Sequence, residues 1–429
     1  MLSRRHLLTS AAALALSGAL APAVQAQEGG PPPPPANAVL KGAVAVTRVF
    51  GDGPRLIAVA LAYDRPIAAK SVGLAGFAVA GRTVTRAYAA LSSAPAPVPA
   101  DGNFVIIELS EDDDAARLVA MNGREARRLL PVARVTATPA MQAVEGSAVP
   151  PLALPVETTI IRNLVIDDFR QLSFTDPGTG LTLAYNLYVP ADYDPARRYP
   201  LVLFMHDAGV TSPVADNTLF QGLGAVAFAD PADQARHPAF VLAPQYDAQI
   251  ANDQSQTTPH MEATIALVQA LVAQYGLDRT RLYATGQSGG GMTAIAMNLK
   301  YPDLFAASLL VACQWDATLC APLAGKKLWV VVAEGDTKAF PGQTAIMEVI
   351  EAAGTPVARA TWDGSASPES LAKAVAAQEA EGRQINFTAF ARNTVALPGQ
   401  TGGAVDHLGT WRIAYGISGL RDWLLRQTL

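Results

Sequence analysis

The chain has 429 residues, half of them hydrophobic and 16% charged, with a mean hydropathy of +0.20. This composition excludes a disordered chain, and the length suits two domains of roughly 100 to 200 residues each. Lysine and arginine number 32 against 37 aspartate and glutamate, which gives a net charge of −5. Without a basic surplus to neutralise phosphates, nucleic acid is not expected as a partner.

Residues 1–26 have the composition of an export signal. Arg4 and Arg5 precede an Ala/Leu-rich stretch, and small residues precede a cleavage point after Ala26. This pattern is typical of a secretory leader, and the arginine pair favours the twin-arginine route. Its apolar run is shorter than the ~20 residues that span a bilayer. We therefore predict a periplasmic or secreted bacterial protein without a stable membrane anchor.

The next segments predict a small all-β domain. Prolines 31–35 indicate an extended tether over residues 27–38. Residues 39–140 then contain short β-like runs separated by Gly, Asp and Pro, which predict an immunoglobulin-like sandwich. The proline-rich residues 141–156 are predicted to be a linker. The β-like runs are 43–50, 55–63, 72–80, 82–89 and 104–109.

The remaining chain, residues 157–429, alternates continuous apolar runs with helical spacing. Such runs are typical of parallel strands buried between two layers of helices, so this domain is predicted to be α/β with a doubly wound sheet. Catalytic groups are expected at the carboxyl ends of its strands. Strands are predicted at 181–189, 200–205, 240–243, 281–285, 307–312 and 328–333, and helices at 259–275, 290–300, 343–353, 368–381 and 416–427.

The strongest chemical signal is the G-x-S-x-G motif Gly286-Gln287-Ser288-Gly289-Gly290. It lies between a predicted strand and a predicted helix. A nucleophile elbow requires this setting, because a tight turn with small neighbours holds the serine in strained backbone geometry. The context of the motif therefore predicts that Ser288 is a nucleophile.

A serine nucleophile needs a base, and in α/β-hydrolases the chain order is serine, acid, histidine. Of the five histidines, only His407 follows Ser288. It is predicted to lie in a loop at 398–409, ahead of the closing helix. The expected acid is Asp336, which follows the predicted strand 328–333 and would accept the imidazole N–H. The alternatives for this role are Asp316, Glu334 and Asp363.

A tetrahedral intermediate also needs two backbone donors. Gly289 follows the nucleophile, and Ala208 lies in the loop after strand 200–205, so these two amides are the expected oxyanion hole. His206 in the same loop is expected to orient neighbouring groups rather than to act as the base. Substrate-lining residues are expected at the same sheet edge, where aromatic side chains suit core packing equally well. They are Gln245, Tyr246, Gln287, Trp315 and Trp411.

Cys313 and Cys320 are the two cysteines of the chain. They enclose residues 314–319, a loop that a disulfide can close in an exported protein, so we predict a bridge. Two buried free thiols are the alternative. No C-x-x-C pair, H-E-x-x-H motif, or nucleotide or flavin motif occurs in the sequence, so neither a metal nor a cofactor is expected.

Several segments carry a family resemblance: 199–206, 243–245, 286–290, 301–306 and 422–425, and less specifically 77–84 and 104–109. They resemble exported α/β-hydrolase esterases of the poly(3-hydroxybutyrate) depolymerase and feruloyl esterase type, especially those with an N-terminal immunoglobulin-like domain. The resemblance implies that Ser288, Asp336 and His407 form a triad. The sequence departs from the family at Asp207, where these enzymes usually have Gly, and at Gln287 before the nucleophile.

The expected function is therefore hydrolysis of a small-molecule or polymer-derived carboxylic ester through an acyl-enzyme. One alternative is a peptidase of the prolyl-oligopeptidase type, which would use the same triad. Another is a non-catalytic protein that binds a polymer or a surface through its first domain. That domain is expected to brace or shield the catalytic domain. The sequence does not indicate an oligomeric state.

Overall fold

The computed structural model describes residues 36–122, 125–397 and 399–429. The predicted leader and most of the predicted tether therefore lie outside the described residues. Residues 37–429 form one compact unit, which contains the β-rich first domain and the α/β domain.

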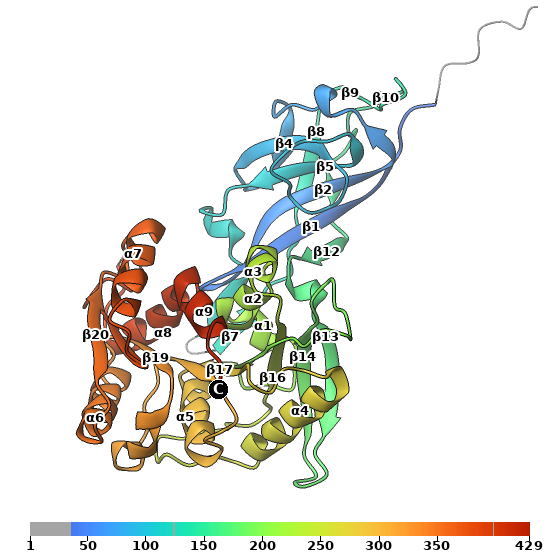
Figure 1. Ribbon diagram of the computed structural model, residues 1–429. Helices are drawn as coiled ribbons and strands as arrows, with labels where there is room; N and C mark the ends of the chain where they lie inside the picture. Colours follow the sequence, from blue (N-terminus) through green and yellow to red (C-terminus); the bar gives the residue numbers. More distant parts are fainter. Residues whose placement is uncertain (1–35, 123–124, 398) are drawn as a thin grey trace, which may run out of the picture. The chain divides into compact units, whose positions relative to one another are not determined.

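The first domain is a two-layered β-structure (Figure 1). Its larger sheet has five strands in the order β12-β1-β2-β5-β4, and its smaller sheet has the order β11-β8-β3. Buried side chains from both sheets, such as Leu61, Ile107 and Val135, share one hydrophobic core. The predicted immunoglobulin-like sandwich is thus confirmed. The strands are β1 (Leu40–Phe50), β2 (Gly53–Ile67), β3 (Phe77–Val79), β4 (Val84–Ala90), β5 (Gly102–Leu109), β8 (Arg134–Ala137), β11 (Val156–Glu157) and β12 (Ile160–Asn163).

The stretch predicted as a linker, 141–156, is instead partly β-structure. β9 (Met141–Gln142) pairs with β10 (Ala148–Val149), and β11 at its end pairs with β8. The next strand, β12, runs parallel to β1 in the larger sheet. Met141 and Val149 are 2% and 1% exposed, so burial of these two side chains anchors a segment whose prolines suggested an open connection. A further antiparallel pair is formed by β6 (Val119–Asn122) and β7 (Glu125–Arg128).

The second domain is built on a nine-stranded sheet in the order β13-β14-β16-β15-β17-β18-β19-β21-β20. β14 runs antiparallel to both of its neighbours, and all other pairs are parallel. The predicted doubly wound α/β fold is therefore confirmed. The strands are β13 (Arg170–Thr175), β14 (Thr182–Tyr188), β15 (Leu201–Met205), β16 (Phe240–Gln245), β17 (Leu282–Gln287), β18 (Ala307–Val311), β19 (Leu328–Ala333), β20 (Val357–Trp362) and β21 (Ile385–Phe390).

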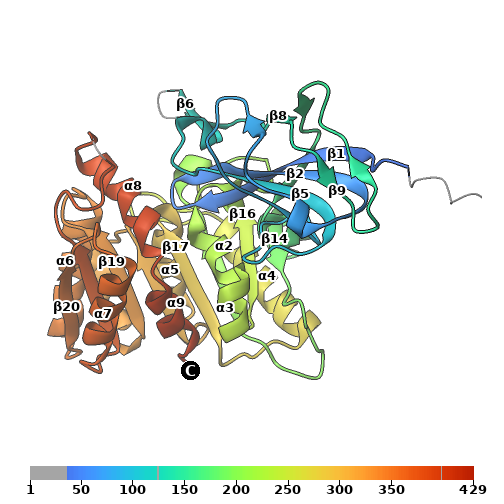
Figure 2. The same cartoon turned by 90° about the horizontal axis from the view of Figure 1, so that it is seen from above.

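Helices cover both faces of this sheet (Figures 1 and 2). α4, α5 and α6 pack on one face, and α2, α3, α7, α8 and α9 lie on the other. Because both faces are covered, every residue of β15, β17 and β19 is buried. In the described part of the chain, no helix is long and apolar enough to span a membrane. The helices are α1 (Asn217–Phe220), α2 (Leu223–Ala229), α3 (Pro231–Arg236), α4 (His260–Tyr275), α5 (Gly289–Lys300), α6 (Ala339–Ala352), α7 (Pro368–Glu379), α8 (Gly403–Ala414) and α9 (Ser418–Leu425).

Candidate active site

Ser288 lies on the tight turn between β17 and α5. Its backbone has φ 50° and ψ −119°, a strained conformation for a residue with a side chain. The neighbours must be small for the turn to form. A Cβ on Gly290 would lie 2.0 Å from the Met205 carbonyl oxygen, and one on Gly286 would lie 2.4 Å from the Gly290 carbonyl carbon. The G-x-S-x-G spacing therefore follows from the packing of this turn against β15.

Three of the predicted residues come together at the end of the sheet. His407 Nε2 lies 3.0 Å from Ser288 Oγ, and His407 Nδ1 lies 2.5 Å from Asp336 Oδ2. An ionised carboxylate only accepts hydrogen bonds, so Nδ1 carries the proton and Nε2 is left to accept one from the serine hydroxyl. The arrangement can thus activate Ser288 as a nucleophile.

Asp336 is held in place by the turn after β19. Its Oδ1 accepts hydrogen bonds from the N–H groups of Lys338, at 3.0 Å, and Ala339, at 2.9 Å. Burial raises the pKa of Asp336, but three influences that lower the pKa outweigh burial. They are the hydrogen bond to His407, the electrostatic interaction with the His407 imidazole, and the hydrogen bonds from these two N–H groups. The net pKa is lowered, so the carboxylate is ionised at neutral pH.

The three alternative acids are engaged elsewhere. Asp316 caps a 3-10 turn through the Thr318 N–H, and Asp363 accepts a hydrogen bond from the Ser365 N–H. Glu334 accepts a hydrogen bond from the Arg392 N–H. Of the acids considered from the sequence, the structure brings Asp336 to His407.

His407 lies within α8 and not in the predicted loop. The glycine-rich residues before it suggested an open loop, but Gly402, at φ 107°, only precedes the first turn of the helix. A Cβ on Gly335 would lie 1.5 Å from Asp406 Oδ2, so glycine at 335 lets α8 approach the turn that holds Asp336. The buried Trp411 ring packs edge-on against the imidazole, with centroids 5.0 Å apart. The helix therefore orients the imidazole.

Two main-chain amides lie beside Ser288. Gly289 is the first residue of α5, and Ala208 is the first residue of a 3-10 turn, Ala208–Val210, after β15. The N–H groups of such first residues have no partner within their own helix. The Ala208 nitrogen lies 3.6 Å from the position that a Cβ on Gly289 would occupy. The Ala208 amide therefore lies close to Gly289, the residue after Ser288, which supports the predicted pair of oxyanion donors.

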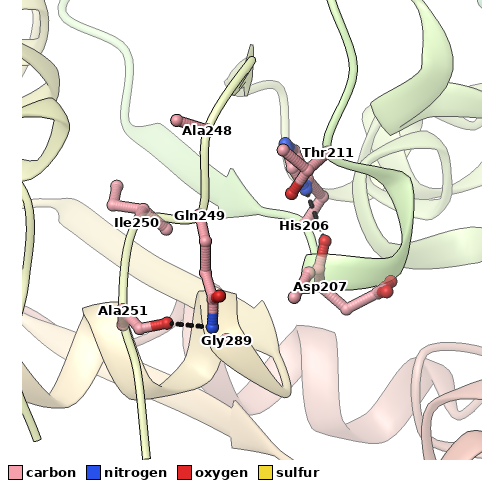
Figure 3. A pocket seen from close by; sticks show the side chains of 9 residues that line it. His206, Asp207, Thr211, Ala248, Gln249, Ile250, Ala251 and Gly289 are labelled. Atoms are coloured by element: carbon pink, nitrogen blue, oxygen red, sulfur yellow. Dashed lines mark hydrogen bonds between the residues drawn. The ribbon is translucent and has the colours of Figure 1, made fainter.

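His206 fixes the orientation of the second donor. Its Nε2 accepts a hydrogen bond from the Tyr246 N–H at 2.9 Å, so its Nδ1 is the donor to the Asp207 carbonyl oxygen at 2.7 Å (Figure 3). In a trans peptide the carbonyl and the following N–H point in opposite directions. Tying back the Asp207 carbonyl therefore turns the Ala208 N–H away from His206. This supports the predicted orienting role.

Burial lowers the pKa of His206, which is 2% exposed. In the unfolded chain, the histidine has a pKa of about 6.5. As the pH falls, the unfolded chain therefore binds a proton at His206 before the folded protein does. The stability from neutral His206 is therefore complete above about pH 6.5 and is lost as the pH falls toward the lowered folded pKa. Between about pH 7.5 and 5.5, the wild-type protein should lose more unfolding free energy in urea titrations than His206→Gln. Equal losses would contradict this assignment.

The two departures from the resembled family contact each other. Asp207 Oδ2 accepts a hydrogen bond from Gln287 Nε2 at 3.0 Å, and Asp207 Oδ1 accepts one from the Gly209 N–H at 2.7 Å. Gln287 Nε2 also donates to Gln221 Oε1 at 2.9 Å. The Asp207 side chain therefore joins the loop that carries Ala208 to the residue just before the nucleophile.

Removing this link should loosen the second donor. We expect Asp207→Ala to lower kcat roughly tenfold with little change in KM. The lost hydrogen bonds position the Ala208 N–H, which as an oxyanion donor would act mainly in the transition state. Asp207→Asn should restore part of the rate, since the Gln287 amide can reverse and accept from the new amide, although this reversal breaks its hydrogen bond to Gln221 Oε1. Steady-state kinetics of both variants check this, and equal losses would show that the negative charge matters instead.

The predicted substrate-lining residues do not line the pocket beside Gly289. Tyr246 is fully buried and its hydroxyl pairs with Thr264, while Gln245 accepts from the Thr218 N–H. Trp315 and Trp411 are also buried. From the sequence, these side chains suited either core packing or contact with substrate. Because they are buried, they belong to the packing of the domain. The residues that do line the pocket are His206, Asp207, Ala208, Thr211, Ala248, Gln249, Ile250, Ala251 and Gly289.

Cys313 and Cys320 are free, buried thiols, so the predicted disulfide is wrong. Each sulfur has another partner: Cys313 Sγ accepts from Gln343 Nε2 at 3.4 Å, and the Cys320 thiol donates to the Asp316 carbonyl at 3.3 Å. Burial raises the pKa of both thiols to about 12, which makes them unreactive near neutral pH. Within the described ranges, no group of three or more His, Cys, Asp or Glu residues is arranged to hold a metal ion.

Comparisons with known proteins give two family matches. Residues 42–150 match the family described as esterase Ig-like N-terminal domain, and residues 248–321 match the prolyl oligopeptidase family. No curated protein matches the sequence.

Among solved structures, a thermostable esterase is 25% identical, with a TM-score of 0.76 over 91% of this chain and 100% of that one. A feruloyl esterase module from Clostridium thermocellum is 13% identical, with a TM-score of 0.40 over 58% and 86%. A fluorophosphonate-binding serine hydrolase of Staphylococcus aureus is 11% identical, with a TM-score of 0.40 over 60% and 98%. The two family matches and the first structure confirm an α/β-hydrolase domain preceded by an immunoglobulin-like domain, and the chain is a serine hydrolase.

Proposed function

We propose that this serine hydrolase cleaves carboxylic esters through an acyl-enzyme on Ser288. One observation carries the proposal: the Ser288 hydroxyl lies 3.0 Å from the Nε2 of a histidine whose other nitrogen is bonded to the Asp336 carboxylate. The amides of Ala208 and Gly289, each the first of its helix and so without a partner within that helix, are the proposed oxyanion donors that acyl transfer needs.

The reaction follows from these positions. His407 accepts the Ser288 proton as Oγ attacks the ester carbonyl carbon, and the oxyanion accepts hydrogen bonds from the Gly289 and Ala208 N–H groups. The imidazolium, stabilised by Asp336, then gives its proton to the departing alkoxide, which leaves the acyl group on Ser288. A water molecule repeats the sequence: His407 takes its proton, hydroxide attacks the acyl carbon, and the proton returns to Ser288 as the acid departs.

Two comparisons favour an ester over a peptide as the substrate. The first domain matches an esterase-associated family, and the solved structure that aligns with nearly the whole chain is an esterase. The match of residues 248–321 to the prolyl oligopeptidase family favours a peptidase as the second candidate. Amide cleavage requires a general acid well aligned with the leaving nitrogen. The departing alkoxide of an activated ester does not need such an acid.

We also propose that the protein is exported. The arginine pair Arg4-Arg5 and the apolar stretch that follows support a periplasmic or secreted location. An ester-cleaving enzyme in that location would meet small or polymer-derived esters. Mass spectrometry of protein from the periplasm of the producing bacterium should find a mature chain that starts near residue 27.

The test of the esterase proposal uses the purified mature protein and p-nitrophenyl acetate, with and without a serine-directed phosphonate. We expect turnover that the phosphonate abolishes and one covalent adduct by intact mass, absent from Ser288→Ala. Peptide p-nitroanilides assayed in parallel should be cleaved far more slowly. Turnover that survives the phosphonate, or an adduct that Ser288→Ala retains, would refute the proposal, and faster anilide cleavage would favour the peptidase.

A further inference from the structure

We propose that Tyr415 is a positioning residue for the proposed acyl transfer, because its hydroxyl ties the helix that carries His407 to the strand that leads to Ser288. The inference rests on the proposed esterase function: it assigns a residue that orients the base of that reaction without touching the substrate. Tyr415 is the first residue after α8, the helix in which His407 lies. Thr285, its partner, belongs to β17, which ends just before Ser288.

The hydrogen bond between Tyr415 and Thr285 is buried and has a defined direction. The two oxygens lie 3.0 Å apart. The Thr285 hydroxyl has a single proton, which it donates to the Leu309 carbonyl at 2.8 Å, so Tyr415 is the donor to Thr285. Burial raises the pKa of Tyr415, which keeps this hydroxyl protonated near neutral pH. Both side chains are fully buried, so water does not compete for the bond.

Two hydrogen bonds therefore connect the segment that carries the base to the strand that leads to the nucleophile. His407 Nε2 and Ser288 Oγ meet at one end, and Tyr415 and Thr285 meet at the other. A strand advances about 3.3 Å and a helix about 1.5 Å per residue, so the two bonds lie roughly 10 Å apart along both elements. A helix with one contact can pivot about it, whereas two separated contacts also fix its direction.

The Tyr415 ring contacts β15, the strand that leads to the loop with Ala208. It packs edge-on against the Phe204 ring, with centroids 5.7 Å apart. Both rings belong to the same hydrophobic core as Trp411, whose ring contacts the His407 imidazole. Tyr415 therefore touches the strand before the nucleophile and the strand before the proposed oxyanion loop, while its main chain continues the helix of the base.

The main chain at Tyr415 is held by α3 and α9. Its carbonyl accepts a hydrogen bond from Arg421 Nη1, and Arg421 Nη2 donates to Asp233 Oδ1 at 3.0 Å. Arg421 and Asp233 are both buried, and a buried ion pair that has lost one of its partners is costly. The backbone of residue 415 therefore stays in place when only the tyrosine hydroxyl is removed, which makes the hydroxyl a separate object of test.

The experiment measures kcat and KM of Tyr415→Phe for p-nitrophenyl acetate, per active site counted with the serine-directed phosphonate. We expect kcat to fall about tenfold with KM nearly unchanged, since a misplacement of a fraction of an ångström between base and nucleophile costs roughly this much. The rate at which the phosphonate inactivates the enzyme should fall in proportion, because that reaction also needs Ser288 activated by His407.

Tyr283→Phe is the matched control. Tyr283 lies in the same strand as Thr285, is also fully buried, and donates to the carbonyls of Leu425 and Gln427 at 3.1 and 2.7 Å. Its hydrogen bonds lead to the C-terminal residues and not to α8. The variant should lose a comparable amount of stability in urea titrations and keep kcat within about twofold of wild type. An equal loss of kcat in both variants would show a general effect of stability and overturn the proposal.

Changes at Thr285 keep the test valid if Tyr415→Phe unfolds. Thr285→Val removes the acceptor and should lower kcat by a similar factor, whereas Thr285→Ser keeps the hydroxyl and should retain most of the rate. If the two residues act through one hydrogen bond, the double variant Tyr415→Phe/Thr285→Val should be no slower than the slower single variant.

Losses that multiply in the double variant, or wild-type kcat in both Tyr415→Phe and Thr285→Val, would overturn the positioning role and leave the esterase proposal standing. Absence of any ester turnover and of any phosphonate adduct in the wild-type protein would overturn both.

Discussion

Replacing Ser288 with alanine should lower kcat by roughly 10⁴ to 10⁶, while KM for p-nitrophenyl acetate changes little. The substitution removes the atom proposed to attack the ester, and the two proposed amide donors and the substrate contacts that remain would account for the residual rate. Alanine should also preserve the fold. The side chain lost is one hydroxyl, and the strained turn at φ 50° is imposed by Gly286 and Gly290 rather than by the serine itself.

Single-turnover and steady-state kinetics measure this effect, with thermal unfolding as the check on the fold. Ser365→Ala is a suitable control, because Ser365 is an exposed serine that bonds only to the turn at Asp363. It should keep the wild-type rate. A Ser288→Ala enzyme that retained half of the wild-type kcat would place the nucleophile elsewhere.

Asp336→Asn should lower kcat by about 10⁴ without unfolding the protein. The asparagine oxygen can still accept from the Lys338 and Ala339 N–H groups, so the turn after β19 is preserved. Its amide N–H₂ then faces His407 Nδ1 and favours the tautomer with the proton on Nε2. In that tautomer His407 Nε2 cannot accept the Ser288 proton, and the base is lost.

The matched control for Asp336→Asn is Asp316→Asn. Asp316 was an alternative acid in the sequence, but its carboxylate caps a 3-10 turn through Thr318. The control should keep kcat within about twofold of wild type and lose only a small part of the stability, since an asparagine cap is nearly equivalent. A large loss in Asp316→Asn, together with an active Asp336→Asn, would reverse the assignment of the acid.

The fold of the catalytic domain was predictable wherever burial made a strand uniformly apolar. β19 has the predicted bounds 328–333, and α7 begins at the predicted residue 368. β21 was missed because Asn386 and Thr388 interrupt its apolar run. Both side chains are buried, and Thr388 accepts from Trp329 Nε1 at 2.9 Å and donates to Gln378 Oε1 at 2.8 Å. Tertiary partners of this kind make a polar residue such as Thr388 compatible with an interior strand.

The chain order and a local turn were enough for the sequence to single out three chemical groups. A G-x-S-x-G turn is a local feature that the sequence itself reveals. The chain order serine, acid, histidine then left His407 as the base and four candidates for the acid. The structure places His407 within hydrogen-bond distance of both Ser288 and Asp336.

Tertiary structure decided what depends on contacts between distant segments. It placed His407 on a helix, left Cys313 and Cys320 as free thiols, joined Asp207 to Gln287, and brought residues 248–251 to the loop after β15 and to Gly289. The physical reason is the same in each case. A motif predicts a backbone turn because that turn depends on a few neighbouring residues. A hydrogen-bond partner or a pocket wall depends instead on which side chains the folded core brings together.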